Sequence, residues 1–316
     1  MDGIVVINKP HKTTSHQVVQ SVRRLFAGSK AGHSGTLDPI ATGVLPVCLG
    51  RATRLVEYII EHPKSYRAAL TLGKTTDTDD SAGQVIDVST PPDLQVNQVK
   101  EILSRFQGDI EQLPPHYSAV KYKGKPLYRW AREGEKVPRK IRQAKIYELK
   151  LLEYHPDREP QLVLDVQCSR GTYIRTLAYD LGQAIGCGGH LYSLTRLAVG
   201  PFVIENSYTP GQLSEMKAAD RIKNAIWPMD SALGMMPALV IDDQEVMALK
   251  NGQIVFLKDL AGQEFSGIVI SDSTHNGLKK GFKVRIYDSR QHFRAIGQLD
   301  PCEEGFRLKT LKFLSS

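Results

Sequence analysis

The sequence of 316 residues contains little cysteine and no long hydrophobic run. Its four cysteines are widely spaced and form no C-x-x-C pair, which is typical of reduced thiols in a reducing compartment. No apolar run approaches the roughly 18 to 20 residues of a membrane-spanning helix. The N-terminal segment carries charges and lacks the apolar core of a signal peptide. We therefore expect a cytoplasmic protein that does not associate with a membrane.

Metal ligands in a recognisable arrangement are also missing. Cys187 and His190 have a C-x-x-H spacing, but no further zinc ligands lie near them in the sequence. The acidic cluster at 77–80 resembles the start of a calcium loop. However, Ala82 stands where that loop needs glycine, and Val88 stands where it needs glutamate. We expect no metal site.

The common enzyme signatures are absent as well. The segment "LGKTT" would belong to a phosphate-binding loop only if residue 68 were glycine, and it is Ala68. The chain contains no G-x-S-x-G, H-E-x-x-H or G-x-G-x-x-G motif and no zinc-deaminase signature. These absences argue against an ATPase of the phosphate-loop type, the common hydrolases and a metal-dependent base deaminase.

Positive charge is concentrated in one segment. Hydrophobic residues make up 41% of the chain and charged residues 24%, a globular composition, and the net charge is +7. Ser118–Lys145 holds ten Lys/Arg against two Glu, so the rest of the chain is close to neutral. A solvated basic face would explain this segment, but Tyr122, Tyr128 and Trp130 are interleaved with the cations. Stacking aromatics beside cations are typical of RNA binding, so we expect a polyanionic partner.

Hydrophobic periodicity predicts an α+β fold. Helices are expected at Val18–Phe26, with Ser15 as N-cap, at Val96–Phe106, and at 171–186, where Gly186 ends the last one. Helices and strands do not alternate regularly, so we expect a mixed, mainly antiparallel sheet flanked by helices. The strands are expected at Gly3–Ile7, Tyr66–Leu72, Gln84–Val88, Lys145–Tyr154 and Gln161–Cys168.

The pattern changes near Pro237. From there the sequence contains short apolar stretches separated by glycine-containing turns, which predicts a small β-rich, barrel-like domain. We therefore divide the chain into a catalytic domain at 1–232 and a second domain at 233–316. Its strands are expected at 253–257, 267–270, 283–288 and 294–299.

One acidic residue, Asp38, stands in an unusual loop. The loop "GHSGTLDPIATGVL" is rich in glycine and hydroxyl groups, and no second acid or cysteine is close to Asp38 in sequence. Much later, Tyr173 and Arg175 are two residues apart, which would place them on one side of an extended segment before the helix. An arginine beside a buried aspartate would lower the pKa of the carboxyl group and keep it ionised. The spacing also fits an ordinary ion pair that holds two loops together.

This loop resembles the active-site motif of the TruB-type tRNA pseudouridine synthases, G-H-[TG]-G-x-L-D-P-x-A-x-G-x-L. The likeness covers "GHSGTLDPIATGVLPVCLGRATRL", "NKPHKTTSH", "KSYRAALTLGKTTDTDD", "PPHYSAVKYKGKPLYRWAREGEKVPR", "GTYIRTL" and "LYSLTRLAVG", in the family's order over most of 1–230. Ser34 replaces the usual Thr or Gly, one small side chain for another. The tail, with "LKNGQIV" and "KVRIYDSRQHFRAIGQL", resembles the small RNA-binding PUA barrel that often follows.

The resemblance implies isomerisation of a uridine in the T-loop of tRNA, at position 55, without metal or cofactor. The family's essential aspartate corresponds to Asp38. The glycosidic C1′–N1 bond must break, the uracil must rotate, and C5 must join C1′. A carboxylate can add covalently to the ring or the sugar, or it can remove a proton from C2′ to give a glycal. The sequence leaves these routes open.

The same resemblance implies roles for five further residues. Tyr173 matches the tyrosine that removes the C5 proton, and Arg175 matches the arginine paired with the aspartate. For uridine binding, His33 would hold the flipped loop, Tyr66 would stack on the uracil, and Leu194 would line the pocket. Each of these three taken alone has a structural explanation, as a turn residue, a strand aromatic or a core leucine.

The resemblance also implies the partner. The basic arm, at about 117–145, would wrap the T-arm of tRNA, and it looks like the stand-alone bacterial type, a monomer without an obligatory protein partner. One alternative is a non-catalytic module that binds or folds RNA. The set Asp38, Tyr173 and Arg175 argues against it, because binding alone would not need a carboxylate beside a phosphate backbone. The other alternative is a guide-dependent synthase that needs added RNA and protein.

Overall fold

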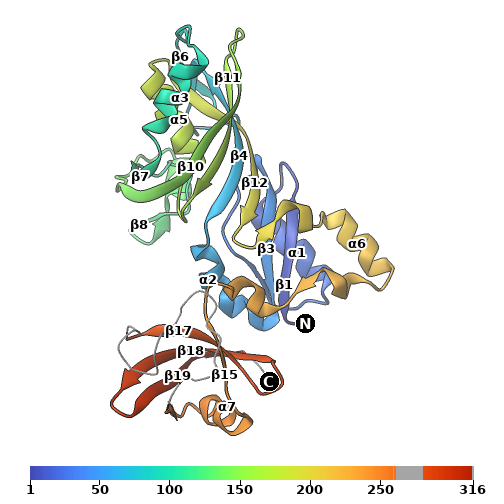
Figure 1. The fold of residues 1–316 in the computed structure, drawn as a ribbon. Coiled ribbons are helices and arrows are strands. Elements are labelled where there is room, and N and C mark those ends of the chain that lie inside the picture. Colours follow the sequence, from blue (N-terminus) through green and yellow to red (C-terminus); the bar gives the residue numbers. More distant parts are fainter. Residues whose placement is uncertain (259, 261–279, 315–316) are drawn as a thin grey trace.

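The N-terminal strand β1 (Gly3–Lys9) is rich in β-branched residues and is buried on both faces, as a strand inside a sheet must be. The computed structural model describes residues 1–258, 260 and 280–314. In these residues β1 belongs to a ten-stranded sheet with the order β14-β1-β3-β12-β4-β11-β10-β7, while β2 pairs with β3 and β13 with β12 (Figure 1). The other strands are β2 (Ala31–His33), β3 (Ala41–Leu49), β4 (Lys64–Leu72), β7 (Gly108–Gln112), β10 (Arg142–His155), β11 (Gln161–Cys168), β12 (Gly189–Val199), β13 (Phe202–Val203) and β14 (Ile226–Trp227).

The neighbours along this sheet are antiparallel except for β3 and β12. These two strands run parallel, with Leu194 opposite Ala41 and Arg196 opposite Gly43. The start of β3 follows the Asp38 loop directly. The parallel pairing therefore places this loop beside the middle of β12.

Helices cover the sheet at both ends (Figure 1). One buried cluster packs α1 and α6 against β1 and β3, and another packs α3 and α5 against β4, β10 and β11. Two short hairpins, β5–β6 and β8–β9, lie outside the sheet. These elements are α1 (Ser15–Leu25), α2 (Val56–Glu61), α3 (Val96–Ser104), α4 (Leu127–Arg132), α5 (Ile174–Ile185), α6 (Pro210–Ala218), β5 (Lys74–Thr76), β6 (Val85–Val88), β8 (Lys121–Tyr122) and β9 (Lys125–Pro126).

The predicted helices are confirmed, with one correction at the start of α1. The N-cap is Thr14 and not Ser15: the Thr14 hydroxyl accepts from the Gln17 N–H at 3.2 Å, in a capping box. Ser15 is the first helical residue, and its hydroxyl is buried against Leu37 instead. At the end of α5, Gly186 adopts φ +90, which confirms the expected C-terminal glycine.

A second, curled sheet of five strands follows, with the order β15-β17-β18-β19-β16. The predicted strands at 253–257, 283–288 and 294–299 correspond to β16, β17 and β18, whereas the one at 267–270 lies outside the described residues. The long strand β19 was not predicted. These elements are β15 (Ala238–Val240), α7 (Asp243–Lys250), β16 (Val255–Leu257), β17 (Phe282–Tyr287), β18 (Phe293–Cys302) and β19 (Gly305–Phe313).

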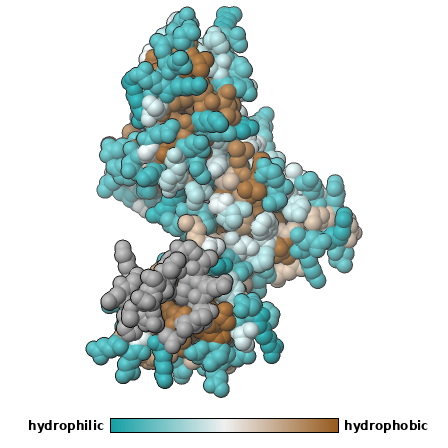
Figure 2. Space-filling view, viewed as in Figure 1, coloured by the Kyte–Doolittle hydropathy of each residue, from teal (hydrophilic) through white to brown (hydrophobic). Residues whose placement is uncertain are grey.

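The curled sheet contacts segments beside the long sheet through residues at the ends of β17 and β19. The Arg51 guanidinium donates to the Leu314 carbonyl at 3.1 Å, and Tyr287 donates its hydroxyl hydrogen to Asp230 at 2.6 Å. Figure 2 shows hydrophobic residues over the upper half of the long sheet and on the curled sheet, with hydrophilic residues around them. Among the described residues, no helix is long and apolar enough to cross a membrane.

The two sheets with their flanking helices confirm the predicted α+β fold class.

Candidate active site

The Asp38 loop connects β2 to β3 and is fastened to the start of α1. The Ser15 hydroxyl donates to the Leu37 carbonyl at 3.0 Å and accepts from the Leu37 N–H at 2.9 Å. The Lys12 N–H donates to the Pro39 carbonyl at 2.8 Å. Backbone on both sides of Asp38 is thus fixed, which holds the carboxylate in one place.

Asp38 forms an ion pair with Arg175, as the sequence suggested. The Nε of Arg175 lies 2.9 Å from an Asp38 carboxylate oxygen. The arginine side chain is only 6% exposed, whereas that of Asp38 is 38% exposed. Arg175 also donates to the carbonyls of Thr78 at 3.1 Å and Tyr117 at 2.8 Å. The guanidinium is therefore fixed from several sides, and the carboxylate remains accessible to a ligand.

Arg175 lowers the pKa of Asp38, as expected from the sequence, but other effects leave the net pKa raised. Burial raises the pKa of Asp38 above that of a free carboxyl, and the nearby Asp80 carboxylate raises it further. Arg175 and Lys9 lower the pKa, but they do not outweigh burial. The result is a more basic carboxylate than an exposed aspartate would have.

Asp38 is not isolated in the structure, because a second acid, Asp80, lies beside the same arginine. Asp80 lies 3.7 Å from the Nε of Arg175, so one guanidinium serves two carboxylates. Its own oxygens accept from the Thr78 hydroxyl at 2.7 Å and the Ala82 N–H at 3.0 Å. The acidic cluster at 77–80 thus supplies a residue of the candidate site. Its only signal in the sequence was the family-like segment "KTTDTDD".

Tyr173 is the N-cap residue of α5, and Arg175 is the second residue of that helix. The predicted extended segment therefore includes Tyr173, whose backbone is extended, but not Arg175, which is helical. The Gln112 side chain fixes Tyr173 by accepting from its N–H at 2.9 Å and donating to its carbonyl at 3.1 Å. Burial raises the pKa of the Tyr173 phenol, against the opposing effects of the Ser118 hydroxyl and nearby arginines.

Tyr66 and Leu194 lie in the same buried cluster as Leu37, next to the Asp38 loop. Both are nearly buried, with exposed fractions of 9% and 7%. Burial raises the pKa of the Tyr66 phenol, and the charge of Asp38 adds to the increase. Both side chains therefore lie close to the Asp38 loop.

His33 is the last residue of β2, and its Nδ1 is buried without a hydrogen-bond partner among the residues that the structure describes. Burial lowers the pKa of its imidazole, and the charges of Arg196 and His16 lower it further. Both effects favour the neutral imidazole. Among the described contacts, none joins His33 directly to Asp38. His33 therefore lies where the loop begins, and it is not part of the carboxylate cluster.

Two buried cations beneath the loop were not predicted. Arg196, 1% exposed, donates to the carbonyls of Val44 at 2.7 Å and Gly35 at 3.1 Å. Lys9 is fully buried and donates to the Thr13 carbonyl at 2.6 Å. Burial lowers the pKa of Lys9 to about 8, although Asp38 opposes this effect. Arg196 thus holds one carbonyl in the Asp38 loop and one in β3, whereas Lys9 holds carbonyls of the segment before α1.

The basic arm packs its aromatics against its own cations. Lys125 lies 4.1 Å from the ring centroid of Trp130, and Arg132 lies 5.5 Å from that of Tyr128. The contact of Arg175 with the Tyr117 carbonyl connects the base of this arm to the carboxylate cluster. Within the described residues, no group of three or more His, Cys, Asp or Glu side chains is arranged to hold a metal ion.

Solved structures with a similar fold include chains of an H/ACA RNP and of a Cbf5-containing complex. The chain aligns over 99% of its length with 85% of a chain in an H/ACA RNP bound to a substrate RNA containing 2′-deoxyuridine, at 25% identity and a TM-score of 0.74. It aligns equally far with a chain of a Cbf5-Nop10-Gar1 complex, at 28% identity and a TM-score of 0.73.

Sequence relatives and family models are more specific. The chain is 47% identical over 223 residues to tRNA pseudouridine synthase B of Francisella tularensis subsp. novicida, covering 70% of this chain and 73% of the relative. The corresponding protein of Francisella philomiragia is 46% identical over the same length. The model of the TruB family pseudouridylate synthase N-terminal domain matches residues 23–174, and that of the tRNA pseudouridylate synthase B C-terminal domain matches 175–234. The chain therefore belongs to the TruB family of pseudouridylate synthases.

Proposed function

We propose that this enzyme converts the uridine at position 55, in the T-loop of tRNA, to pseudouridine, with Asp38 as its essential residue. The observation that carries the proposal is the geometry around Asp38. Its carboxylate is accessible, lies 2.9 Å from a buried arginine, and acts electrostatically on the phenols of both Tyr66 and Tyr173. Relatives named tRNA pseudouridine synthase B support tRNA as the substrate.

The reaction exchanges one ribose bond for another. The C1′–N1 bond breaks, the uracil turns, and C5 bonds to C1′, after which C5 loses a proton and N1 gains one. No water or redox partner is consumed. A carboxylate whose pKa is raised by burial is a stronger nucleophile and base than a free one, which suits covalent addition as well as proton removal from C2′.

We assign the removal of the C5 proton to Tyr173. Because burial raises the pKa of its phenol, the free enzyme holds this group protonated. The Ser118 hydroxyl and the charges of Arg142 and Arg175 favour the phenolate, so they would assist its formation as the proton is transferred. Arg175 aligns Asp38 at the same time.

The uridine must leave the T-loop stack before it can react. Extruding a base costs a few kcal/mol, and stacking on an aromatic ring returns about 1 to 3 kcal/mol. We assign the stacking to Tyr66 and the lining of the pocket to Leu194. His33 is suited to hold the rearranged loop, because its surroundings favour the neutral imidazole and its Nδ1 has no hydrogen-bond partner among the described residues.

The remaining assignments concern domains and partners. We propose a catalytic domain at 1–232, with the basic arm at about 117–145 wrapping the T-arm, and a PUA-like RNA-binding domain at 233–316. The separate curled sheet supports this division. We further propose a cytoplasmic monomer that needs no protein partner, metal or cofactor.

Tritium release from a tRNA transcript labelled at uridine C5 tests the function. The purified wild-type protein should release tritium without added RNA or protein, and Asp38→Asn should release none. Activity in Asp38→Asn would contradict the role of Asp38. Binding of tRNA without release would favour a non-catalytic module, and release only with guide RNA and protein partners would favour a guide-dependent synthase.

A further inference from the structure

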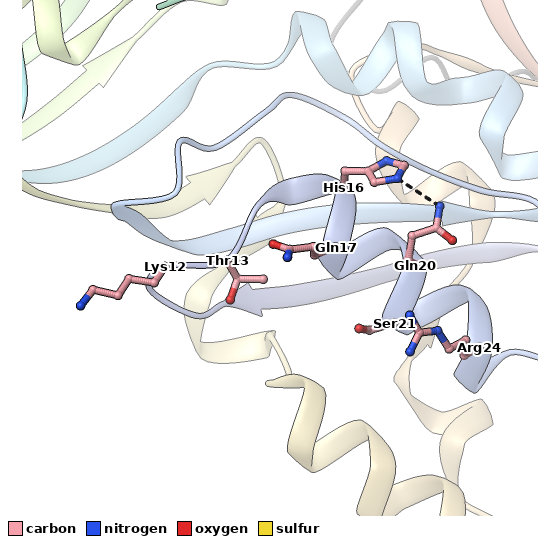
Figure 3. A pocket seen from close by; sticks show the side chains of 7 residues that line it. All are labelled: Lys12, Thr13, His16, Gln17, Gln20, Ser21 and Arg24. Atoms are coloured by element: carbon pink, nitrogen blue, oxygen red, sulfur yellow. Dashed lines mark hydrogen bonds between the residues drawn. The ribbon is translucent and has the colours of Figure 1, made fainter. Parts of the chain in front are cut away.

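An open groove of about 370 Å³ follows the exposed side of α1 (Figure 3). Its lining comes from three successive turns of α1 and from the loop just before it. From His16 to Arg24 the helix rises by about 12 Å. The lining residues are Lys12, Thr13, His16, Gln17, Gln20, Ser21 and Arg24.

The groove is positively charged and has no acidic residue nearby in the sequence. Residues 3–37 contain five Lys/Arg and no Asp or Glu. Two of these cations, Lys12 and Arg24, stand at the two ends of the groove, and within the described part of the chain neither forms an ion pair. Helices of soluble proteins usually mix both signs of charge on an exposed face. This one presents only cations and neutral side chains.

The chemistry of the lining suits a sugar–phosphate backbone. Between the two cations lie hydroxyl, amide and imidazole groups, and Gln20 contacts His16 at 3.4 Å. Such side chains, together with Lys and Arg, make most contacts to phosphate and sugar oxygens in nucleic-acid complexes. No large apolar side chain lines the groove, so an amphipathic protein segment would find nothing there to bury.

The groove begins at the active-site loop. Lys12 donates its N–H to the Pro39 carbonyl at 2.8 Å, His11 contacts the Ile40 carbonyl at 2.9 Å, and Ser15 is bonded to Leu37. These contacts join the first turn of α1 to the residues beside Asp38. A polyanion held at Asp38 would therefore lie next to one end of the groove.

We infer that the α1 groove binds the phosphate backbone of the substrate RNA outside the loop that contains the reacting uridine. This inference rests on the proposed function, because it takes RNA as the substrate. The groove would act as a second contact that holds the RNA without touching the uracil, and Lys12 and Arg24 would each neutralise one phosphate. It lies apart from the basic arm, which comes from 117–145.

The test compares Lys12→Gln/Arg24→Gln with wild type and with the matched control Lys100→Gln/Lys150→Gln. The control removes the same charge from exposed residues of α3 and β10, at the far end of the long sheet (Figure 1). The dissociation constant for tRNA is measured over a range of salt concentrations. Two lost phosphate contacts should reduce the slope of log K against log salt by about 1.4 to 1.8. We expect about a tenfold weaker affinity at about 0.1 M salt, with an unchanged kcat at saturating tRNA.

Two results would overturn the inference. The first is a dissociation constant within twofold of wild type and an unchanged salt slope, which would leave the groove to an acidic protein or to no ligand. The second is an equal loss of tRNA affinity in the control variant, which would show that the effect comes from net charge alone. Failure of the proposed function is separate, because it would appear as wild-type protein that binds tRNA without converting uridine.

Discussion

The Nε of Arg175 lies 2.9 Å from Asp38 and 3.7 Å from Asp80, so one buried guanidinium joins two carboxylates that come from different loops. Asp38 is the more exposed partner, and Asp80 is held from behind by the Thr78 hydroxyl and the Ala82 N–H. Asp80 therefore orients the arginine, and the arginine orients the carboxylate that faces the ligand. Four predictions follow from this arrangement and from the cations beneath it.

Replacing Arg175 by methionine should reduce kcat by about 100- to 1,000-fold, the cost typical of losing one preorganised electrostatic contact. Arg175 is also the main group that lowers the pKa of Asp38. The pH below which activity is lost should therefore move upward in the variant. The measurement is the pH–rate profile of tritium release. An acid limb that stays at the wild-type pH would contradict the pairing of the two side chains.

Asp80→Asn should lower kcat by about tenfold or more while leaving the affinity for tRNA within about twofold, because Asp80 contacts Arg175 and not the accessible side of Asp38. Single-turnover conversion at saturating enzyme separates the chemical step from binding. Asp77→Asn provides a control from the same cluster, since within the described part of the chain the Asp77 side chain accepts a hydrogen bond from the Gln84 N–H in the turn and forms no ion pair with Arg175. Equal losses in both variants would indicate a general disturbance of the turn.

Asp38→Asn should stabilise the fold at neutral pH. Burial raises the pKa of Asp38 above its ordinary value of 3.8, so the folded protein disfavours the charged form. Its stability contribution therefore declines as pH rises from about 3.8 through the folded pKa, and below 3.8 no cost remains. The free energy of unfolding in urea should be higher for the variant at neutral pH and converge with wild type in acid. A difference between the free energies of unfolding of variant and wild type that stays the same at every pH would contradict the raised pKa.

Arg196→Met should lower the free energy of unfolding by about 1 to 3 kcal/mol, because two buried carbonyls, those of Val44 and Gly35, lose their donor. Urea unfolding measures this change. Arg67→Met is the matched control. Arg67 lies in the neighbouring strand β4 and forms a solvent-exposed ion pair with Asp165, so its replacement should lower the free energy of unfolding by less than about 1 kcal/mol. Equal effects would mean that Arg196 does not hold the loop.

Elements governed by local sequence were predictable. Strand β1 is a run of β-branched residues, and α5 ends at a glycine in the left-handed region, so nearest neighbours decide both. The motif around Asp38 and its pairing with Arg175 could also be predicted, because the motif resembles that of a known family and opposite charges in one site attract. The N-cap of α1 was predicted one residue too late. Thr14 and Ser15 are both suitable N-cap residues, and only the hydrogen bond of Ser15 to Leu37 in the tertiary structure decides between them.

Three features depended on the tertiary structure. Asp80 meets Arg175 only because the turn after β5 contacts β12 beside α5, and no spacing along the chain encodes that distance. Lys9 and Arg196 are both buried where β1 and β12 flank β3, each opposite Gly43, and that strand order is set by the tertiary structure. The raised pKa of Asp38 is a balance between lost water and nearby charge. The sequence by itself determined which groups are available for the reaction, and packing decided how strongly each holds its proton, because desolvation depends on every segment that surrounds the site.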